Sequence, residues 1–261
     1  MNVLVAVKEA ALVGDTFQIS NGTIPDQYIT YELNEWDEYA LETAVQLVEA
    51  ETADTVTTVT IGPPRADETI RKALAKGADR AIRIWDPALE NREYLDSSAK
   101  ARLLKPIIER EAPELVLTGV QSDDDMFGAT GVSLAALLDY GWAAVVNDLT
   151  VESETLAVRR ELEGGIEELA TIDLPAICTI QTGINEPRYA SLRGIRMAQR
   201  TEIETYDLSD LGLAESELDG AVTREQMAHP VAESTAEIFE GDATETARQL
   251  ARFLREAGVG N

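Results

Sequence analysis

The chain has 261 residues, of which 48 are Asp or Glu and 22 are Lys or Arg, so its formal net charge at pH 7 is −26. A field of this sign repels polyanions, which excludes nucleic acid and anionic membrane surfaces as expected partners. The acidic residues are spread along the whole chain, a pattern that suits a protein in concentrated salt, where charge repulsion is screened. We therefore interpret the charge as an adaptation to a halophilic cytoplasm that says little about the ligand.

The scarcity of Cys and His excludes several kinds of site. Cys178 lies in the apolar run LPAICTI and is expected to be a buried structural thiol, and a single Cys excludes an internal disulfide. The lone His229 is a poor candidate for a metal site or a catalytic triad. Because no apolar run approaches the roughly 18 residues of a membrane span, and the chain opens on the strand-like NVLVAVK, we expect a cytoplasmic protein that is not membrane-embedded.

The first 140 residues alternate between strand-like and helix-like stretches. Short apolar or β-branched runs predict buried strands, and apolar residues at helical spacing predict helices. The predicted strands are 3–7, 55–62, 80–85 and 114–119, and the predicted helices are 36–50, 66–78, 97–111 and 132–140. This alternation predicts a mainly parallel sheet with right-handed crossovers, whose ligands bind beyond the carboxyl ends of the strands.

Beyond residue 140 the pattern becomes β-rich. Four stretches predict strands that add antiparallel pairs to the first sheet, with a hairpin through Gly164 and Gly165: AAVVNDLTVES, TLAVRRELEGG, IEELATIDL and AICTIQT. Residues 201–241 are acidic and sparsely apolar, which predicts an extended arm, and 244–258 predicts a final amphipathic helix. That helix either docks on its own domain or holds a partner subunit. We therefore expect an α/β domain at 1–200 and an arm with a helix at 201–261.

The segment between the strand at 114–119 and the helix at 132–140 is the main candidate for a ligand site. A strand, a glycine-bearing loop and a helix form a cradle for phosphate, because backbone N–H groups at the start of a helix favour an anion. The loop comprises Ser122, Asp123, Asp124, Asp125, Gly128, Ala129, Thr130, Gly131 and Ser133.

The three consecutive acids of this loop do not match a calcium-binding loop, whose ligands alternate along the chain. We expect the acids to cap the following helix and shape the loop, while backbone N–H groups between Gly128 and Gly131 and the Thr130 hydroxyl receive a phosphate. The alternative, equally supported by the loop alone, is a capped helix with an acidic face toward solvent.

The turn ahead of the first helix contains Asn34, Glu35, Trp36 and Asp37. It would meet the acidic loop if both lie above the same edge of the sheet, and Trp36 would then offer an aromatic face to a ring. In isolation, a helix cap at Asn34 beside a packed Trp is the favoured interpretation.

The stretch 181–200, QTGINEPRYASLRGIRMAQR, is the candidate for a partner surface. Arg188 and three further Arg residues flank the apolar Leu192, Ile195 and Met197, and apolar residues flanked by Arg are typical of interaction surfaces. A buried loop that supplies counter-charges to neighbouring acids is the alternative.

Familiar enzyme motifs are missing from the sequence. It contains neither a Walker P-loop, nor a GxSxG elbow, nor a GxGxxG motif after the first strand. With one His and one apolar Cys there are few candidates for acid–base or covalent catalysis. We therefore expect a carrier or binding subunit rather than an enzyme, with neither catalytic residues nor a metal site.

Six segments together resemble the β subunit of electron transfer flavoprotein. They are VLVAVK (3–8), LNEWDEYALETAVQL (33–47), GADRAIRI (77–84), LVLTGVQSDDDMFGATG (115–131), LPAICTI (174–180) and NEPRYASL (185–192). The resemblance covers residues 1 to 200 and implies the adenine-nucleotide α-hydrolase-like, Rossmann-like α/β fold. It also implies an electron carrier that pairs with an α subunit and connects dehydrogenases to a quinone oxidoreductase or another acceptor.

The same resemblance implies where the cofactors lie. AMP, or a second FAD in electron-bifurcating members, would sit above the sheet among Ala6, the turn Asn34–Asp37, Ile61 and the loop from Ser122 to Ser133. Trp36 matches an aromatic residue facing an FAD that is shared with the α subunit. Ala129 stands where the family usually has Gln, and the choice between AMP and FAD stays open.

The partner surfaces implied by the resemblance lie elsewhere in the chain. Glu161 matches an acid at the interface with the α subunit. Leu192 matches the apolar anchor of the loop that docks dehydrogenases, with Arg188 and Ile195 beside it.

Two rival classes share the expected fold. An ATP pyrophosphatase would need an SGGxDS-type phosphate loop after the first strand, which the sequence lacks. A non-redox, universal-stress-type nucleotide-binding protein would be a homodimer, and the acidic arm and the Arg-rich loop would then have no explanation.

Overall fold

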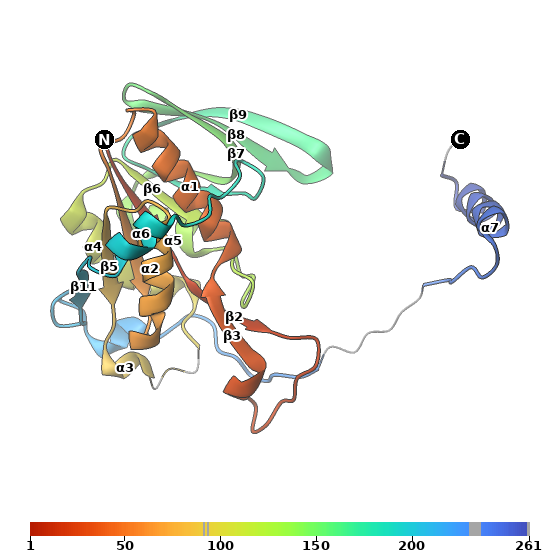
Figure 1. Cartoon of the computed structure of the whole chain (residues 1–261), viewed down its shortest axis with the longest axis horizontal. Helices are drawn as coiled ribbons and strands as arrows, with labels where there is room; N and C mark the ends of the chain where they lie inside the picture. Colours follow the sequence, from red (N-terminus) through yellow and green to blue (C-terminus); the bar gives the residue numbers. More distant parts are fainter. Residues whose placement is uncertain (91, 93, 230–235, 260–261) are drawn as a thin grey trace. The chain divides into compact units, whose positions relative to one another are not determined.

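The computed structural model describes residues 1–90, 92, 94–229 and 236–259. They form two compact units, Met1–Gln226 and Met227–Asn261. The larger unit is a layered α/β structure and the smaller one contains a single helix (Figure 1). None of the helices in the described ranges has the length and apolar character needed to cross a bilayer.

Within the described residues the main sheet has nine strands in the order β11-β5-β4-β1-β6-β10-β7-β8-β9. All neighbours from β11 to β7 are parallel, and the pairs β7–β8 and β8–β9 are antiparallel. The strands are β1 (Asn2–Ala6), β4 (Thr55–Ile61), β5 (Arg80–Ile84), β6 (Leu115–Gly119), β7 (Gly141–Glu152), β8 (Thr155–Leu162), β9 (Ile166–Asp173), β10 (Ala176–Ile180) and β11 (Ile203–Tyr206). The predicted mainly parallel sheet with antiparallel additions is confirmed, but β10, from the stretch AICTIQT, pairs in parallel with both β6 and β7.

Helices cover both faces of the sheet (Figure 1). One face packs α1 (Glu35–Glu49), α2 (Asp67–Ala75) and α6 (Leu192–Ala198), and the other packs α3 (Pro87–Glu90), α4 (Ser97–Glu111) and α5 (Thr130–Leu138). Side chains along β1 alternate between the two cores, as a strand requires: Val3 and Val5 face α1, whereas Leu4 faces α4. Short 3₁₀ turns lie at Asp26–Tyr28, Pro64–Ala66, Glu163–Gly165 and Glu215–Leu218.

The strand order changes direction at β1. The chain passes from β1 to β4 and β5 on one side, and then crosses to β6 on the other side of β1. At such a switch point the two crossovers leave in opposite directions, which opens a crevice beyond the carboxyl ends of the strands. A small antiparallel hairpin, β2 (Glu9–Val13) and β3 (Ile29–Leu33), follows β1 at this edge and was not predicted.

Most helices and strands of the larger unit lie where the local sequence pattern predicts them. The predicted strands and helices of the first 140 residues are confirmed to within a few residues at their ends. The hairpin through Gly164 and Gly165 is also confirmed, since both residues have the positive φ angles, 76° and 74°, that glycine tolerates.

The boundary expected at residue 200 differs from the observed one. Residues 201–226 belong to the larger unit, because β11 pairs with β5 at the edge of the sheet, and Leu208 and Leu218 are buried in its core. This segment is sparsely apolar, as its sequence indicated, but its few leucines are placed where they reach the sheet and α4.

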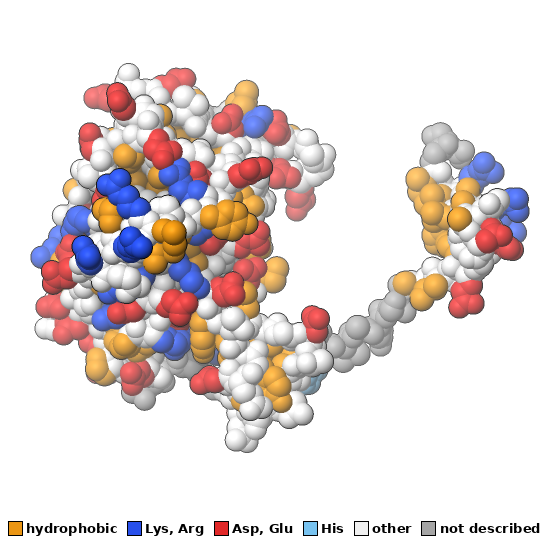
Figure 2. Space-filling model, in the orientation of Figure 1, with side chains coloured by type: hydrophobic (Ala, Val, Ile, Leu, Met, Phe, Trp, Pro, Cys, Tyr) orange, Lys and Arg blue, Asp and Glu red, His pale blue; other side chains and the backbone are white. Residues whose placement is uncertain are grey.

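The smaller unit consists of α7 (Ala243–Glu256) and the segment before it, which confirms the predicted terminal helix. The Asp242 carboxylate caps the helix by accepting hydrogen bonds from the backbone N–H groups of Thr244 and Glu245, at 2.8 and 2.9 Å. The apolar residues Leu250, Phe253 and Leu254 remain exposed, and Figure 2 shows hydrophobic side chains gathered along one side of this helix.

Candidate nucleotide-binding site

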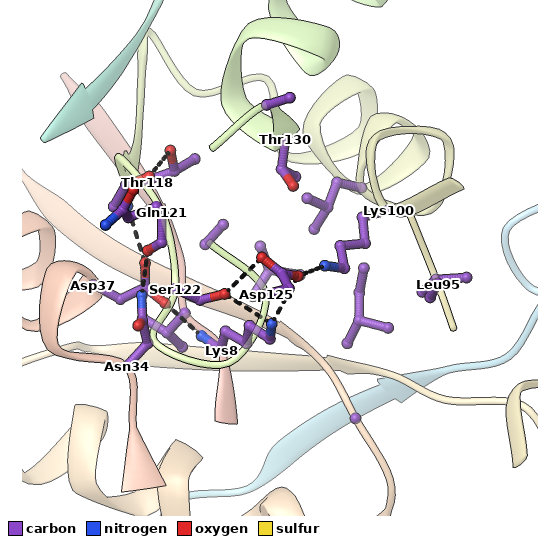
Figure 3. A pocket seen from close by; sticks show the side chains of 18 of the residues that line it. Lys8, Asn34, Asp37, Leu95, Lys100, Thr118, Gln121, Ser122, Asp125 and Thr130 are labelled. Carbon is purple, nitrogen blue, oxygen red and sulfur yellow. Dashed lines mark hydrogen bonds and ion pairs between the residues drawn. The ribbon is translucent and has the colours of Figure 1, made fainter. Parts of the chain in front are cut away.

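A cavity of about 260 Å³ lies at the carboxyl ends of β1, β4 and β6 (Figure 3). One wall is apolar and comes mainly from Val59, Ile61, Pro63, Trp85, Leu89, Leu95 and Leu104. The polar part of the lining comes from Lys8, Lys100, Ser122, Asp125 and Thr130. A planar ring would fit the apolar wall, and a sugar or a phosphate would fit the polar part.

Nine of the predicted cofactor-binding residues line this cavity: Ala6, Asn34, Asp37, Ile61, Ser122, Asp125, Gly128, Ala129 and Thr130. Six others lie outside its lining: Glu35, Trp36, Asp123, Asp124, Gly131 and Ser133. Most of the predicted cofactor-binding residues therefore lie together at this edge of the sheet.

The turn before α1 meets the acidic loop, as the sequence suggested. Asn34 donates through Nδ2 to the backbone oxygen of Gln121 at 2.9 Å, and its Oδ1 accepts from the backbone N–H of Asp123 at 3.3 Å. Asn34 occupies the N-cap position of α1, but its side chain makes no capping hydrogen bond to the helix and bonds to the loop instead. The predicted proximity of the two segments is confirmed.

The carboxylate of Asp37 joins three elements at the edge of the cavity. Its Oδ2 accepts from the backbone N–H of Lys8 at 2.7 Å, and its Oδ1 accepts from the backbone N–H of Gly119 at 2.9 Å. The start of α1 is thereby tied to the ends of β1 and β6.

Two lysine side chains form ion pairs with acidic residues of the loop. Lys8 donates through Nζ to Ser122 Oγ at 2.9 Å, Asp124 Oδ1 at 2.5 Å and Asp125 Oδ2 at 3.1 Å. Lys100, from α4, donates to Asp125 Oδ2 at 2.5 Å (Figure 3). Burial raises the pKa of Asp125, but the hydrogen bond and charge of Lys100, together with the charge of Lys8, outweigh it and hold that pKa well below its usual range. These ion pairs fix the loop, which is the shaping role expected of the acids.

The expectation that an Asp caps the following helix is wrong. Helix α5 has Ala129 at its N-cap position, and no side chain in the described ranges caps it. Asp125 Oδ1 instead accepts from the backbone N–H of Phe127 at 3.2 Å, inside the loop. The first N–H groups of α5 therefore stay available beside the cavity, which Ala129 and Thr130 line.

Gly131 allows the first turn of α5 to lie close to the sheet. A Cβ atom at this position would lie 2.7 Å from Thr179 Cγ2 and 2.8 Å from Thr118 Oγ1. The helix start, with the positive end of its dipole, is held at the ends of β6 and β10.

Trp36 lies outside the lining of this cavity, and its expected position facing an FAD shared with the α subunit stays a prediction. Its indole Nε1 donates to Gln181 Oε1 at 3.3 Å. The aromatic group in the cavity wall is Trp85, which follows β5.

Sequence reasoning missed Lys8, Lys100, Trp85 and Leu95. Lys8 had a detectable signal, since it follows the buried run VLVAV and must lie at the carboxyl edge of the sheet. Lys100 lies in the first turn of α4, and nothing in its neighbourhood along the chain marks it as a site residue.

Cys178 is fully buried in β10, as predicted, and burial raises the pKa of its thiol to about 12. Among the described residues, no group of three or more His, Cys, Asp or Glu side chains could hold a metal ion.

The predicted docking residues lie away from the cavity. The side chain of Leu192, the first residue of α6, is 77% exposed, and Ile195 on the same helix is also exposed. Figure 2 shows basic and hydrophobic side chains interspersed over this region. Glu161 is exposed near the end of β8. The guanidinium of Arg188 is bound within the chain, to Glu42 and Glu49 of α1.

A cavity at the switch point of a mainly parallel sheet, beside an uncapped helix start, is typical of Rossmann-like α/β proteins. Residues 21–211 match the family model described as the electron transfer flavoprotein domain. The chain is 40% identical to the electron transfer flavoprotein subunit beta of Methylophilus methylotrophus, over 98% of each chain. It is 34% identical to the pig protein of that name, over 99% of this chain and 98% of that one, and 32% identical to the Bacillus subtilis protein, over 98% of both.

The chain therefore belongs to the electron transfer flavoprotein β-subunit family, which confirms the resemblance and the fold class. The matches extend along nearly the whole chain and favour this family over the ATP pyrophosphatase and universal-stress classes.

Proposed function

We propose that the chain is the electron-carrying β subunit of a heterodimer, accepting electrons from dehydrogenases and delivering them to a quinone oxidoreductase or another acceptor. The observation that supports this proposal is the cavity at the switch point, which nine of the predicted cofactor-binding residues line. The subunit performs no bond chemistry of its own. Its partner is the α subunit, with which it shares an FAD, and that flavin supplies the electron-carrying chemistry.

The residues present fit an adenine nucleotide, either AMP or a second FAD. The apolar wall suits the adenine ring, and the N–H groups at the start of α5 with the Thr130 hydroxyl suit a phosphate. Lys8 and Lys100 add two positive charges in the same polar part of the lining, although Asp124 and Asp125 balance them. The chain binds and orients the nucleotide and excludes water from one side of it.

Mass spectrometry of the nucleotide released on denaturation tests this proposal, using the protein purified with its α subunit in high salt. One AMP per β subunit beside a single FAD per heterodimer indicates a simple electron shuttle. Two FAD and no AMP indicate an electron-bifurcating complex, and attention then turns to Ala129. Release of no nucleotide beyond a single FAD would contradict the assignment of the cavity.

Removing Asp124 and Thr130 together should weaken nucleotide binding. Asp124 accepts from Lys8 and Ser122, and from the backbone N–H of Ala11 at 3.3 Å, so its loss frees the loop, while the loss of the Thr130 hydroxyl removes a donor in the polar part of the lining. The loss of the contacts that hold the loop, together with one hydrogen bond to the phosphate, should lower the affinity by about tenfold or more. The Asp124→Ala/Thr130→Ala variant should therefore release less nucleotide, with an unchanged far-ultraviolet circular dichroism spectrum.

The matched control is Asp15→Ala/Thr16→Ala, which removes the same residue types from an exposed loop outside the cavity lining. Equal nucleotide occupancy in the two double variants and the wild type would refute the role of the acidic loop.

Leu192→Ala should slow electron transfer from a dehydrogenase while leaving the bound cofactors in place. An exposed apolar anchor buried at the centre of an interface contributes enough that its removal weakens docking by about tenfold or more. The measurement is the rate of heterodimer reduction by a flavoprotein dehydrogenase at limiting heterodimer concentration. The control is Leu169→Ala, an equally exposed leucine on β9 at 80% exposure. The docking role is refuted if both leucine variants are reduced as fast as the wild type.

A further inference from the structure

We infer that Arg188 is a positioning residue, which holds the docking loop in the conformation that presents Leu192 by clamping it to helix α1 through Glu42 and Glu49. The docking loop is defined here as residues 185–198. The inference rests on the proposed docking role of Leu192 and extends it to the side chains that hold the loop against α1.

The Arg188 guanidinium forms a pair of hydrogen bonds with each of the two carboxylates, an arrangement called the fork below. Arg188 donates to Glu42 through Nε at 2.7 Å and Nη2 at 2.9 Å, and to Glu49 through Nη1 at 2.6 Å and Nη2 at 2.9 Å. The backbone N–H of Arg188 adds a bond to Glu42 Oε2 at 3.2 Å. Paired, planar contacts of this kind fix orientation as well as distance, because both carboxylates meet the guanidinium edge to edge.

Glu42 and Glu49 lie on the side of α1 that faces Arg188. Glu42 and Glu49 are seven residues apart and so lie two turns apart on one face of α1. The Glu42 side chain is only 5% exposed, so it cannot reach a partner protein. Burial raises the pKa of Glu42, but its hydrogen bonds with Arg188 and Gln46 outweigh burial and lower that pKa, so the carboxylate stays charged beneath the loop.

Further hydrogen bonds and a close backbone contact hold the loop before and after Arg188. Asn185 Nδ2 donates to the backbone oxygen of Tyr39 at 3.0 Å and to Thr43 Oγ1 at 2.9 Å, both on α1. Lys76 Nζ donates to the backbone oxygen of Arg188 at 2.8 Å. At Gly194 the first turn of α6 touches the backbone oxygen of Ala75, so closely that a Cβ atom there would overlap it.

The side chains that the loop presents are in contrast open to solvent. Tyr189 and Leu192 directly follow the clamped segment and are among the most exposed apolar residues described. An apolar anchor on a rigid base loses less conformational entropy when it docks than one on a mobile loop. The ion pairs of Arg188 therefore matter for geometry, since a buried ion pair is a weak source of stability but a strong constraint on orientation.

The test measures KM and kcat for reduction of the heterodimer by a flavoprotein dehydrogenase that reduces the wild type. Arg188→Met should raise KM about tenfold, as expected for a displaced anchor, with kcat changed by less than about twofold. Glu42→Gln should shift KM in the same direction, although Glu42 is buried beneath the loop. Arg188→Lys keeps the charge but loses the fork, and should fall between Arg188→Met and the wild type.

Three controls separate positioning from other causes. Reduction by dithionite, which needs no docking, should be unchanged in every variant. Lys105→Met removes one positive charge from α4, on the opposite face of the sheet, and should leave KM within about twofold of the wild type. In the Leu192→Ala background, Arg188→Met should add less than about twofold to KM, because both changes remove the same anchor.

The possible failures are distinguishable. If Leu192→Ala raises KM and Arg188→Met does not, docking stands and the positioning inference is overturned. If the two effects multiply in the double variant, Arg188 acts independently of Leu192 and the inference is again overturned. If neither variant changes KM, the proposed docking role itself is wrong and the inference falls with it.

Discussion

Gly119→Ala is expected to lower the free energy of unfolding by about 3 kcal/mol, the upper end of what overpacking a tight core costs. A Cβ atom at this position would lie 2.5 Å from Trp36 Cβ, 2.6 Å from Asp37 Oδ1 and 2.9 Å from the backbone carbon of Trp36. These neighbours are backbone or short side-chain atoms at the start of α1, so they move only if the helix moves. Such a shift also stretches the hydrogen bond from the Gly119 N–H to Asp37.

Urea denaturation in high salt, followed by circular dichroism, measures this loss. The matched control is Gly14→Ala, where nothing lies within 4 Å of the added atom and the change should stay within about 0.5 kcal/mol. Equal stability of the two variants would contradict the close contact of α1 with β6.

The contribution of Asp37 to stability is expected to fall as the pH rises from about 4 to about 7. Burial raises the pKa of Asp37 to about 7 from its ordinary 3.8, although hydrogen bonds from the Lys8 and Gly119 N–H groups favour the charged form. Since the folded-state pKa is above the unfolded one, the stabilisation is complete below the unfolded pKa and is lost as the pH rises through the folded pKa. A shift of this size corresponds to roughly 2–4 kcal/mol.

The comparison of wild type with Asp37→Asn isolates this carboxyl group, because the many other acids cancel in the difference. The free energy of unfolding of the wild type minus that of the variant should decrease by that amount between pH 4 and pH 8. A difference that does not change with pH would show that Asp37 has an ordinary pKa.

Much of the fold follows from local pattern. The short run VLVAV, apolar on both faces, predicted a buried strand, and the helical spacing in 36–50 and 97–111 predicted α1 and α4. The hairpin at Gly164 and Gly165 was predictable because both turn positions need positive φ angles. Segment 203–206 was missed because its pairing with β5 depends on a neighbour about 120 residues away along the chain.

The site was predictable where its residues follow strands. Ala6, Ile61 and the loop after Gly119 lie at carboxyl ends of parallel strands, and that position alone brings them together. Lys100 was not predictable, because it lies on helix α4 and reaches Asp125 in a loop that is distant along the chain. The sequence suggested that the acids cap α5, whereas two lysines distant in sequence engage Asp124 and Asp125. The interactions of Asp124 and Asp125 therefore depend on residues that are distant along the chain, which the local sequence pattern does not reveal.

The most direct test of the central claim is to produce the chain together with its α subunit and purify the complex in high salt. We predict a one-to-one complex with bound FAD, in which a flavoprotein dehydrogenase bleaches the visible flavin absorbance and a quinone oxidoreductase restores it. A flavin-free homodimer of this chain, which takes up adenine nucleotide but no electrons, would contradict the claim.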